Sequence, residues 1–145
     1  MRVLLQRVTS AEVRVSGQVV GAIGSGLLAF VGIQRGDDGA TVERMAGRIA
    51  GYRMFADERG RMNRSVRDIG GAVLLVSQFT LAADTEKGLR PGFSSAAEPG
   101  EARRLCDALA AGLRDSGLPV AEGEFGADMQ VGLVNDGPVT FLINL

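Results

Sequence analysis

The sequence predicts an α+β fold in which a largely antiparallel, barrel-like sheet carries helices on its outside. Three observations support this prediction. Most apolar stretches have the length or the two-residue period of strands, two segments have the period of a helix, and strands and helices do not alternate as regular βαβ units. With 145 residues, the chain suits a single domain that spans residues 1–145 and buries roughly 70% of the surface of the unfolded chain.

Strand character is strongest at residues 73–76, where four large aliphatic residues follow one another. Both faces of such a strand are normally covered, so we expect residues 72–83 to form a central strand. Pro138 has no N–H to give to a ladder, which places it at the start of the last strand. In chain order, the expected strands are two within residues 13–24 around a Ser-Gly turn, then 27–34, 72–83, 120–125, 128–135 and 139–145.

Two segments have the periodicity of amphipathic helices. The first begins after Asp37 or Asp38, either of which suits an N-cap, and the second covers about residues 100–115 and ends before Gly117. We expect Cys106 to be a packing residue rather than a reactive thiol, because it lies on an apolar stripe. The expected buried positions are Val42, Met45, Ala46, Ile49 and Ala50 in the first helix, and Ala102, Leu105, Cys106, Leu109 and Leu113 in the second.

The composition excludes several kinds of catalytic chemistry. The chain has no histidine, which removes Ser-His and Cys-His pairs, imidazole acid–base catalysis and the usual zinc sites. Its single cysteine excludes an internal disulfide and a thiolate metal cluster. An enzyme with this composition has to use carboxylates, hydroxyls, amides, arginine or groups of the substrate. We expect no cofactor and no metal, because no set of carboxylates has the spacing of metal ligands.

The charge and hydropathy favour a soluble, cytoplasmic protein with no membrane partner. No apolar run approaches the ~18 residues that span a membrane, and the N-terminus lacks the features of a signal peptide. The net charge of −1 does not indicate nucleic-acid binding, for which a basic domain is usual. The clustered cations are expected to be solvated surface, with phosphate contact as the alternative: Arg59, Arg61, Arg64, Arg67, Lys87 and Arg90.

The segment SQFTL, residues 77–81, is the first candidate for a site, because it interrupts an apolar stretch with polar side chains. Its polar groups either cap the end of a strand or face a pocket. A covalent hydroxyl nucleophile is disfavoured, since no histidine can activate Ser77 or Thr80. We expect instead that backbone N–H groups polarise a carbonyl group while water attacks it.

Two further segments, FGADM at residues 125–129 and DGPVT at residues 136–140, each read as a connecting turn or as part of a site. An exposed Phe125 beside small residues can stack on a nucleobase. Gly137-Pro138 presents bare backbone that another molecule can approach closely. The trans preference of an X-Pro bond is only ~0.5–1 kcal/mol, so the sequence leaves the isomer open.

Three stretches together resemble the D-aminoacyl-tRNA deacylases over nearly the whole chain and in order. They are MRVLLQRV at residues 1–8, GGAVLLVSQFTLAADTEKGLRPGFS at residues 70–94 and FGADMQVGLVNDGPVTF at residues 125–141. The resemblance implies an α+β homodimer with barrel-like sheets and outer helices. It also implies a proofreading hydrolase whose partner is the acceptor end of aminoacyl-tRNA, and which cleaves the ester between a D-amino acid and the terminal adenosine.

The same resemblance implies roles for individual residues. Main-chain groups around Phe79 and Thr80 are expected to polarise the ester, and Thr80 is either a nucleophile or only part of the pocket wall. Gly137 and Pro138 are expected to reach across the dimer into the partner's pocket, with Arg7 fixing their orientation. The implied catalytic residues are Ser77, Gln78, Phe79 and Thr80, and the implied substrate-binding residues are Gly137, Pro138, Phe125, Met129 and Arg7.

A steric argument links Gly137-Pro138 to selectivity. If its carbonyl groups occupy the place of an L side chain, an L-aminoacyl group clashes and a D-aminoacyl group does not. Glycine has no side chain to reject, so we expect glycine mischarged on alanine tRNA to be removed as well. The alternatives are an L-alanyl editing enzyme with a trans Gly-Pro bond, a nucleic-acid-binding module without catalysis, and a generic esterase, which the missing histidine disfavours.

Overall fold

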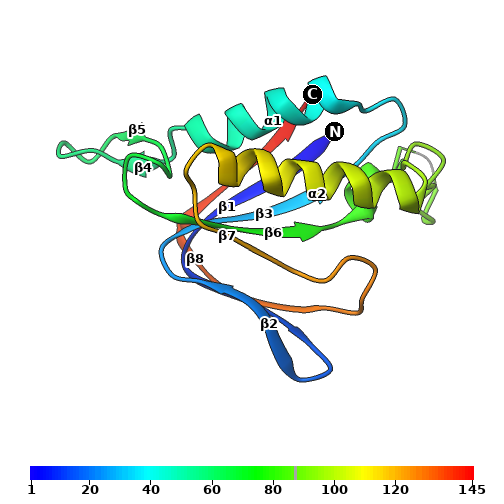
Figure 1. The fold of residues 1–145 in the computed structure, drawn as a ribbon, viewed down its shortest axis with the longest axis horizontal. Coiled ribbons are helices and arrows are strands. Elements are labelled where there is room, and N and C mark those ends of the chain that lie inside the picture. Colours follow the sequence, from blue (N-terminus) through cyan, green and yellow to red (C-terminus); the bar gives the residue numbers. More distant parts are fainter. Residues whose placement is uncertain (87) are drawn as a thin grey trace.

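One mixed sheet forms the centre of the computed structural model, which describes residues 1–86 and 88–145 (Figure 1). Lys87, one of the cations named above, lies outside these residues. The strand order is β2-β1-β3-β6-β7, and β8 pairs with β1. The strands of this sheet are β1 (Arg2–Val15), β2 (Gln18–Ile23), β3 (Gly26–Gly32), β6 (Ala72–Ser77), β7 (Val120–Glu122) and β8 (Gln130–Asn144).

The predicted α+β class and largely antiparallel sheet are confirmed. β1 runs antiparallel to β2, β3 and β8, whereas the pairs β3–β6 and β6–β7 are parallel. The sheet is nearly closed, because β2 folds back to β7: a β-carbon on Gly21 would collide with the carbonyl oxygen of Glu122. A separate hairpin of β4 (Phe55–Ala56) and β5 (Met62–Arg64) projects from one end of the molecule (Figure 1).

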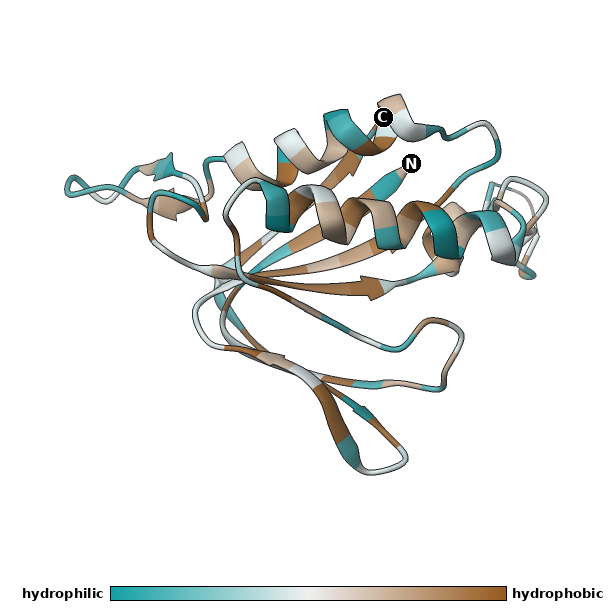
Figure 2. Ribbon diagram, viewed as in Figure 1, coloured by the Kyte–Doolittle hydropathy of each residue, from teal (hydrophilic) through white to brown (hydrophobic). Residues whose placement is uncertain are grey.

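The helices α1 (Gly39–Gly51) and α2 (Pro99–Asp115) lie side by side over one face of the sheet, and their apolar sides face it (Figure 2). All ten predicted apolar positions of the two helices are buried. Asp38 is the N-cap of α1, since its Oδ1 accepts the Thr41 N–H at 2.8 Å. This bond also holds the pKa of Asp38 below its ordinary value. Asp37 instead binds the Met1 amino group at 2.7 Å.

The prediction of one strand over residues 72–83 is wrong in its second half. β6 ends at Ser77, and the 3₁₀ helix η1 (Phe79–Ala82) follows. Gln78 donates the last ladder bond, from its N–H to the carbonyl oxygen of Val31 at 2.7 Å, and then accepts the Leu81 N–H. η1 rests directly on β3 because the residue beneath it is Gly32, where a β-carbon would lie 2.8 Å from Cβ of Leu81.

The prediction of two strands over residues 128–135 and 139–145 is also wrong, because β8 runs without a break from Gln130 to Asn144. Gly137-Pro138 lies inside this strand as a bulge: Gln6 faces Thr140 and Val8 faces Asn135, which leaves four residues of β8 opposite Arg7 alone. The strand tolerates a proline here because β8 pairs with β1 on one side only within the described residues.

None of the helices among the described residues is both long and apolar enough to cross a membrane.

Candidate active site

A cavity of about 410 Å³ opens where β6 ends. Ser77 and Gln78 line it at the end of β6, and Phe79 lines it from the first position of η1. Phe125 and Met129 line it from the connection between β7 and β8. The structure therefore brings together two segments that are far apart in the sequence and that were both singled out as candidates. α2 contributes apolar side chains to the same cavity, including that of Cys106.

The N–H groups of Phe79, which lines the cavity, and of Thr80, the next residue, are the chemically notable feature of this segment. They are the first N–H groups of η1, which have no acceptor within a helix. Among the described residues, neither donates a hydrogen bond to the main chain or to a side chain. Each is therefore available to a ligand, and an ester carbonyl oxygen is a group that two such donors can polarise.

The Thr80 side chain is exposed and is not part of the cavity wall. Its hydroxyl oxygen accepts a hydrogen bond from the Gln78 side-chain amide. A neutral carboxamide is not a base in either of its two orientations, so it cannot take the hydroxyl proton. The geometry thus gives Thr80 no activating partner within the part of the chain that the structure describes.

Phe125 is half-buried and packs against the main apolar core. The guanidinium of Arg103 lies 5.5 Å from the centre of its ring, in the position of a cation–π contact. Phe125 is therefore not the exposed aromatic side chain on which the nucleobase-stacking interpretation depended, although it lines the cavity. Met129 packs against the smaller apolar cluster below it.

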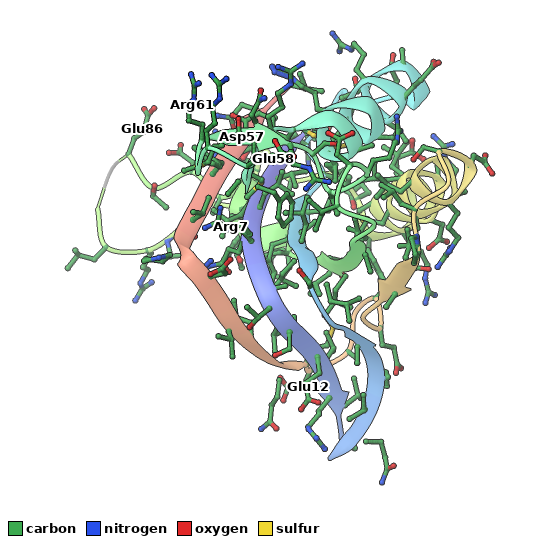
Figure 3. All side chains as sticks on the ribbon, turned by 90° about the vertical axis from the view of Figure 1, so that its left-hand side faces the viewer. Arg7, Glu12, Asp57, Glu58, Arg61 and Glu86 are labelled. Atoms are coloured by element: carbon green, nitrogen blue, oxygen red, sulfur yellow. The ribbon has the colours of Figure 1, made fainter. Side chains whose placement is uncertain are left out.

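Gly137 and Pro138 are exposed and do not line the cavity of their own chain. The peptide bond between them is cis, and Gly137 has φ 121°, in the region that favours glycine. Arg7 lies beside the bend in β8 (Figure 3) and donates to the carbonyl oxygens of Asp136 at 3.2 Å and Met54 at 2.8 Å. Nε of Arg7 also lies 3.2 Å from a carboxylate oxygen of Asp136.

Asn135 is a structural residue of this bulge that the sequence analysis missed. Its side-chain amide donates to the carbonyl oxygens of Arg7 at 2.8 Å and Val139 at 3.0 Å, which replaces ladder bonds that the bulge interrupts. Its side-chain oxygen accepts from the Thr140 hydroxyl at 3.2 Å. Asn, Asp, Gly and Pro are all typical turn residues, so the sequence offered little indication that Asn135 bridges the bulge.

The arginines of the β4–β5 hairpin lie away from this cavity. Arg59 and Arg61 extend from the β4–β5 hairpin, which Figure 1 places at the opposite end of the molecule from the end of β6, and Figure 3 labels Arg61 beside Asp57 and Glu58. The carboxylate of Asp57 accepts the N–H groups of both Arg59 and Arg61 at 2.9 Å, and these bonds lower its pKa. Arg59 and Arg61 are exposed, which suits both solvated surface and phosphate contact, so the choice between these two interpretations stays a prediction.

Cys106 is buried, as predicted, and burial raises the pKa of its thiol to about 12. We expect a thiol-specific chromogenic reagent at pH 8 to label native protein about 10³-fold more slowly than unfolded protein, because the reactive thiolate is scarce in the fold. The absorbance of the released chromophore, with and without denaturant, measures both rates. Equal rates would show that the side chain is open to solvent.

No group of three or more acidic or cysteine side chains among the described residues is placed to hold a metal ion. The nearly closed sheet with its two outer helices matches the fold of a solved structure. A solved structure described as a probable eukaryotic D-amino acid tRNA deacylase matches with a TM-score of 0.85, over 99% of this chain and 98% of that chain. At 16% identity, this match shows the shared fold alone.

The chain belongs to the D-Tyr-tRNA(Tyr) deacylase family, whose sequence model matches residues 4–144. A D-aminoacyl-tRNA deacylase from Alcanivorax borkumensis is 62% identical over 145 residues, which is 100% of both chains. The solved structure of a c-Myc DNA unwinding element binding protein is 38% identical, with a TM-score of 0.95 over 100% of this chain and 99% of that one.

Proposed function

We propose that this chain is a D-aminoacyl-tRNA deacylase, which hydrolyses the ester between a D-amino acid and the terminal adenosine of tRNA. The observation that carries the proposal is the pair of N–H groups at Phe79 and Thr80, which donate no hydrogen bond within the described part of the chain. Phe79 lines a cavity large enough for an aminoacylated nucleoside, and Thr80 follows it directly. The family relationship supplies the substrate class. Residues 1–145 act as one domain, and the substrate places the enzyme in the cytoplasm.

The mechanism uses main-chain groups and the substrate rather than an ionisable side chain. The ester carbonyl oxygen accepts the N–H groups of Phe79 and Thr80, which stabilise the negative charge that develops on it. Water attacks the carbonyl carbon, and the vicinal 2′-OH of the ribose relays the proton of the water to the 3′ oxygen. The bond between the carbonyl carbon and the 3′ oxygen then breaks, which releases the amino acid and a free tRNA end.

Selectivity for the D enantiomer is assigned to Gly137-Pro138 of a second copy of the chain in a homodimer. These two residues are exposed and do not line their own cavity. Hydrogen bonds from Arg7 to Asp136 and from Asn135 to Val139 hold the chain on either side of them, so they can act as a rigid projection into another chain. A mobile side chain could move aside, whereas backbone fixed in this way cannot. Rejection of the L enantiomer by ~10⁴ needs about 5.5 kcal/mol, more than the ~1–3 kcal/mol of one methylene contact.

Hydrolysis of matched D-tyrosyl-, L-tyrosyl- and glycyl-tRNA tests this function. We expect loss of the D-tyrosyl and glycyl esters and survival of the L-tyrosyl ester, since glycine carries no side chain to reject. Cleavage of D-tyrosyl-tRNA with glycyl-tRNA spared would contradict steric exclusion. With L-alanyl-tRNA and a small activated ester as further substrates, the same assay tests the alternatives. Cleavage of every ester would indicate a generic esterase, and cleavage of L-alanyl-tRNA alone would indicate the L-alanyl editing activity.

Replacement of Thr80 by alanine tests whether its hydroxyl acts as a nucleophile. We expect Thr80→Ala to keep kcat within about tenfold of the wild type, because the hydroxyl has no base and the Thr80 N–H is retained. Single-turnover hydrolysis of D-tyrosyl-tRNA measures this effect. A loss of several orders of magnitude, or an acyl-enzyme trapped on the wild type and absent from the variant, would identify Thr80 as the nucleophile.

The name of the 38%-identical solved structure favours one second candidate, nucleic-acid binding without hydrolysis. This candidate predicts that the wild type binds RNA or DNA and leaves every aminoacyl ester intact. The assay above therefore distinguishes the two functions directly.

A further inference from the structure

Two exposed aromatic rings stand together at the rim of the cavity. The side chains of Phe79 and Phe93 are 60% and 41% exposed, and their ring centres lie 5.1 Å apart with planes inclined by 51°. Phe79 also lines the cavity, whereas Phe93 does not, so the pair continues from the cavity onto the outer surface. The proposed hydrolysis uses the main chain of Phe79 and gives no role to either ring.

The loop that carries Phe93 is tied to its surroundings by hydrogen bonds on both sides of the ring. Asp84 and Gly92 exchange a pair of main-chain bonds at 2.8 and 2.9 Å, which closes the loop before Phe93. After Phe93, the Ser95 hydroxyl donates to the carbonyl oxygen of Ala82 at the end of η1. The Ser95 carbonyl oxygen in turn accepts the Arg35 N–H at 2.9 Å. Phe93 is therefore fixed against η1.

We propose that the Phe79–Phe93 pair is a stacking platform for the unpaired nucleobase that precedes the terminal adenosine of the substrate. This inference rests on the proposed function, which places the aminoacylated adenosine in the cavity. A cavity of about 410 Å³ is near the lower end of small-ligand sites, about 300–1,000 Å³, and has no room for a second nucleotide. The next nucleotide, joined by one phosphodiester, has to lie at the rim, where the two rings are open.

Stacking suits this position because every nucleobase has an aromatic face, and an enzyme that edits many tRNAs meets the same single-stranded end on each. Stacking of a base on a protein aromatic ring is worth ~1–3 kcal/mol.

Two substitutions of Phe93 test the platform. Phe93→Leu keeps an apolar contact with Phe79 and removes the aromatic ring, and Phe93→Tyr keeps the ring. Phe93 is therefore the better probe, since the main chain of Phe79 has a separate role.

The kinetic test compares two substrates. We expect Phe93→Leu to raise KM for D-tyrosyl-tRNA about tenfold with kcat unchanged, and Phe93→Tyr to restore the wild-type value. With D-tyrosyl-adenosine, which lacks the preceding nucleotide, the two variants and the wild type should agree within about twofold. An equal loss on both substrates would overturn the proposal, because Phe93 would then act only by supporting η1.

A fluorescence measurement tests the platform without hydrolysis. The probe is an RNA acceptor-stem helix with 2-aminopurine in the penultimate position and D-tyrosine attached to the 3′ end through an amide. We expect the wild type and Phe93→Tyr to change the 2-aminopurine emission on binding, and Phe93→Leu to leave it at the value of free RNA. If this difference in emission appears but neither the wild type nor any variant hydrolyses D-tyrosyl-tRNA, the stacking platform is supported and the proposed function is contradicted.

The remaining candidate for the open rings is a second copy of the chain. Sedimentation of the wild type and of Phe93→Leu distinguishes this occupant. An unchanged oligomeric state with the emission difference above supports the nucleobase. A dimer that dissociates in Phe93→Leu, or emission unaffected by that substitution, overturns the proposal.

Discussion

Phe79→Pro is expected to lower kcat for D-tyrosyl-tRNA by about 10²–10³ relative to Phe79→Ala, because proline removes one of the two N–H groups that polarise the ester. The backbone is suited to this substitution. Phe79 is the first residue of η1, a position where proline is well tolerated, and Gln78 before it is not helical, with φ −142° and ψ 78°. The N–H that is lost makes no hydrogen bond among the described residues.

Phe79→Ala is the matched control, because it removes the same ring and keeps the N–H. Single-turnover rates at saturating enzyme compare the two variants without a contribution from KM, and thermal unfolding shows whether they are equally folded. Equal rates for folded alanine and proline variants would contradict a role for the Phe79 N–H and would leave the proposed mechanism without one of its donors.

Gly137→Ala is expected to lower the ratio of kcat/KM for D-tyrosyl- over L-tyrosyl-tRNA by at least about 100-fold, from a proposed value of ~10⁴. An alanine β-carbon at φ 121° would lie 2.8 Å from Cγ2 of Val139 and 2.9 Å from Nη2 of Arg7. The backbone has to move to relieve both contacts, and the excluding carbonyl groups move with it. Hydrolysis of the two esters over a range of enzyme concentrations measures the ratio.

The control for Gly137→Ala lies in the same strand. A β-carbon on Gly132 meets only Cγ of Glu12, at an ordinary 3.7 Å, so Gly132→Ala should retain the selectivity. A folded Gly137→Ala protein that still spares L-tyrosyl-tRNA would remove Gly137-Pro138 from the account of selectivity.

Local patterns predicted the helices well and the strands in part. Apolar residues recur with a clear helical period over residues 42–50 and 102–113, and each helix buries the side that this pattern indicated. The break at Ser77 and the continuity of β8 depend on contacts between distant residues, namely Gly32 under η1 and Arg7 opposite the bulge. Such contacts produce no periodic pattern of apolar residues in the local sequence. The parallel pairing of β3 with β6 was not foreseen for the same reason.

Residues 77–81 were singled out because polar side chains interrupt an apolar stretch, and residues 125–129 because Phe125 stands beside small residues in a turn-like segment. The cavity brings these two segments together. The separation of Gly137-Pro138 from the cavity of the same chain agrees with a role toward a second chain, which stays a prediction. The Phe79–Phe93 pair was not foreseen, because an aromatic residue in a polar loop shows neither its exposure nor its neighbour.

The pairing of β1 with β8 has a consequence for biosynthesis. β1 leaves the ribosome long before β8, the strand that covers one of its edges from Arg2 opposite Asn144 to Arg14 opposite Gln130. At ~5–20 residues per second, synthesis of the intervening chain takes on the order of 10 s. During that time the apolar side chains of β1 lack a native neighbour along this edge. The nascent chain is thus exposed to aggregation along this edge until β8 emerges, and chaperone demand should fall sharply once β8 has paired with β1.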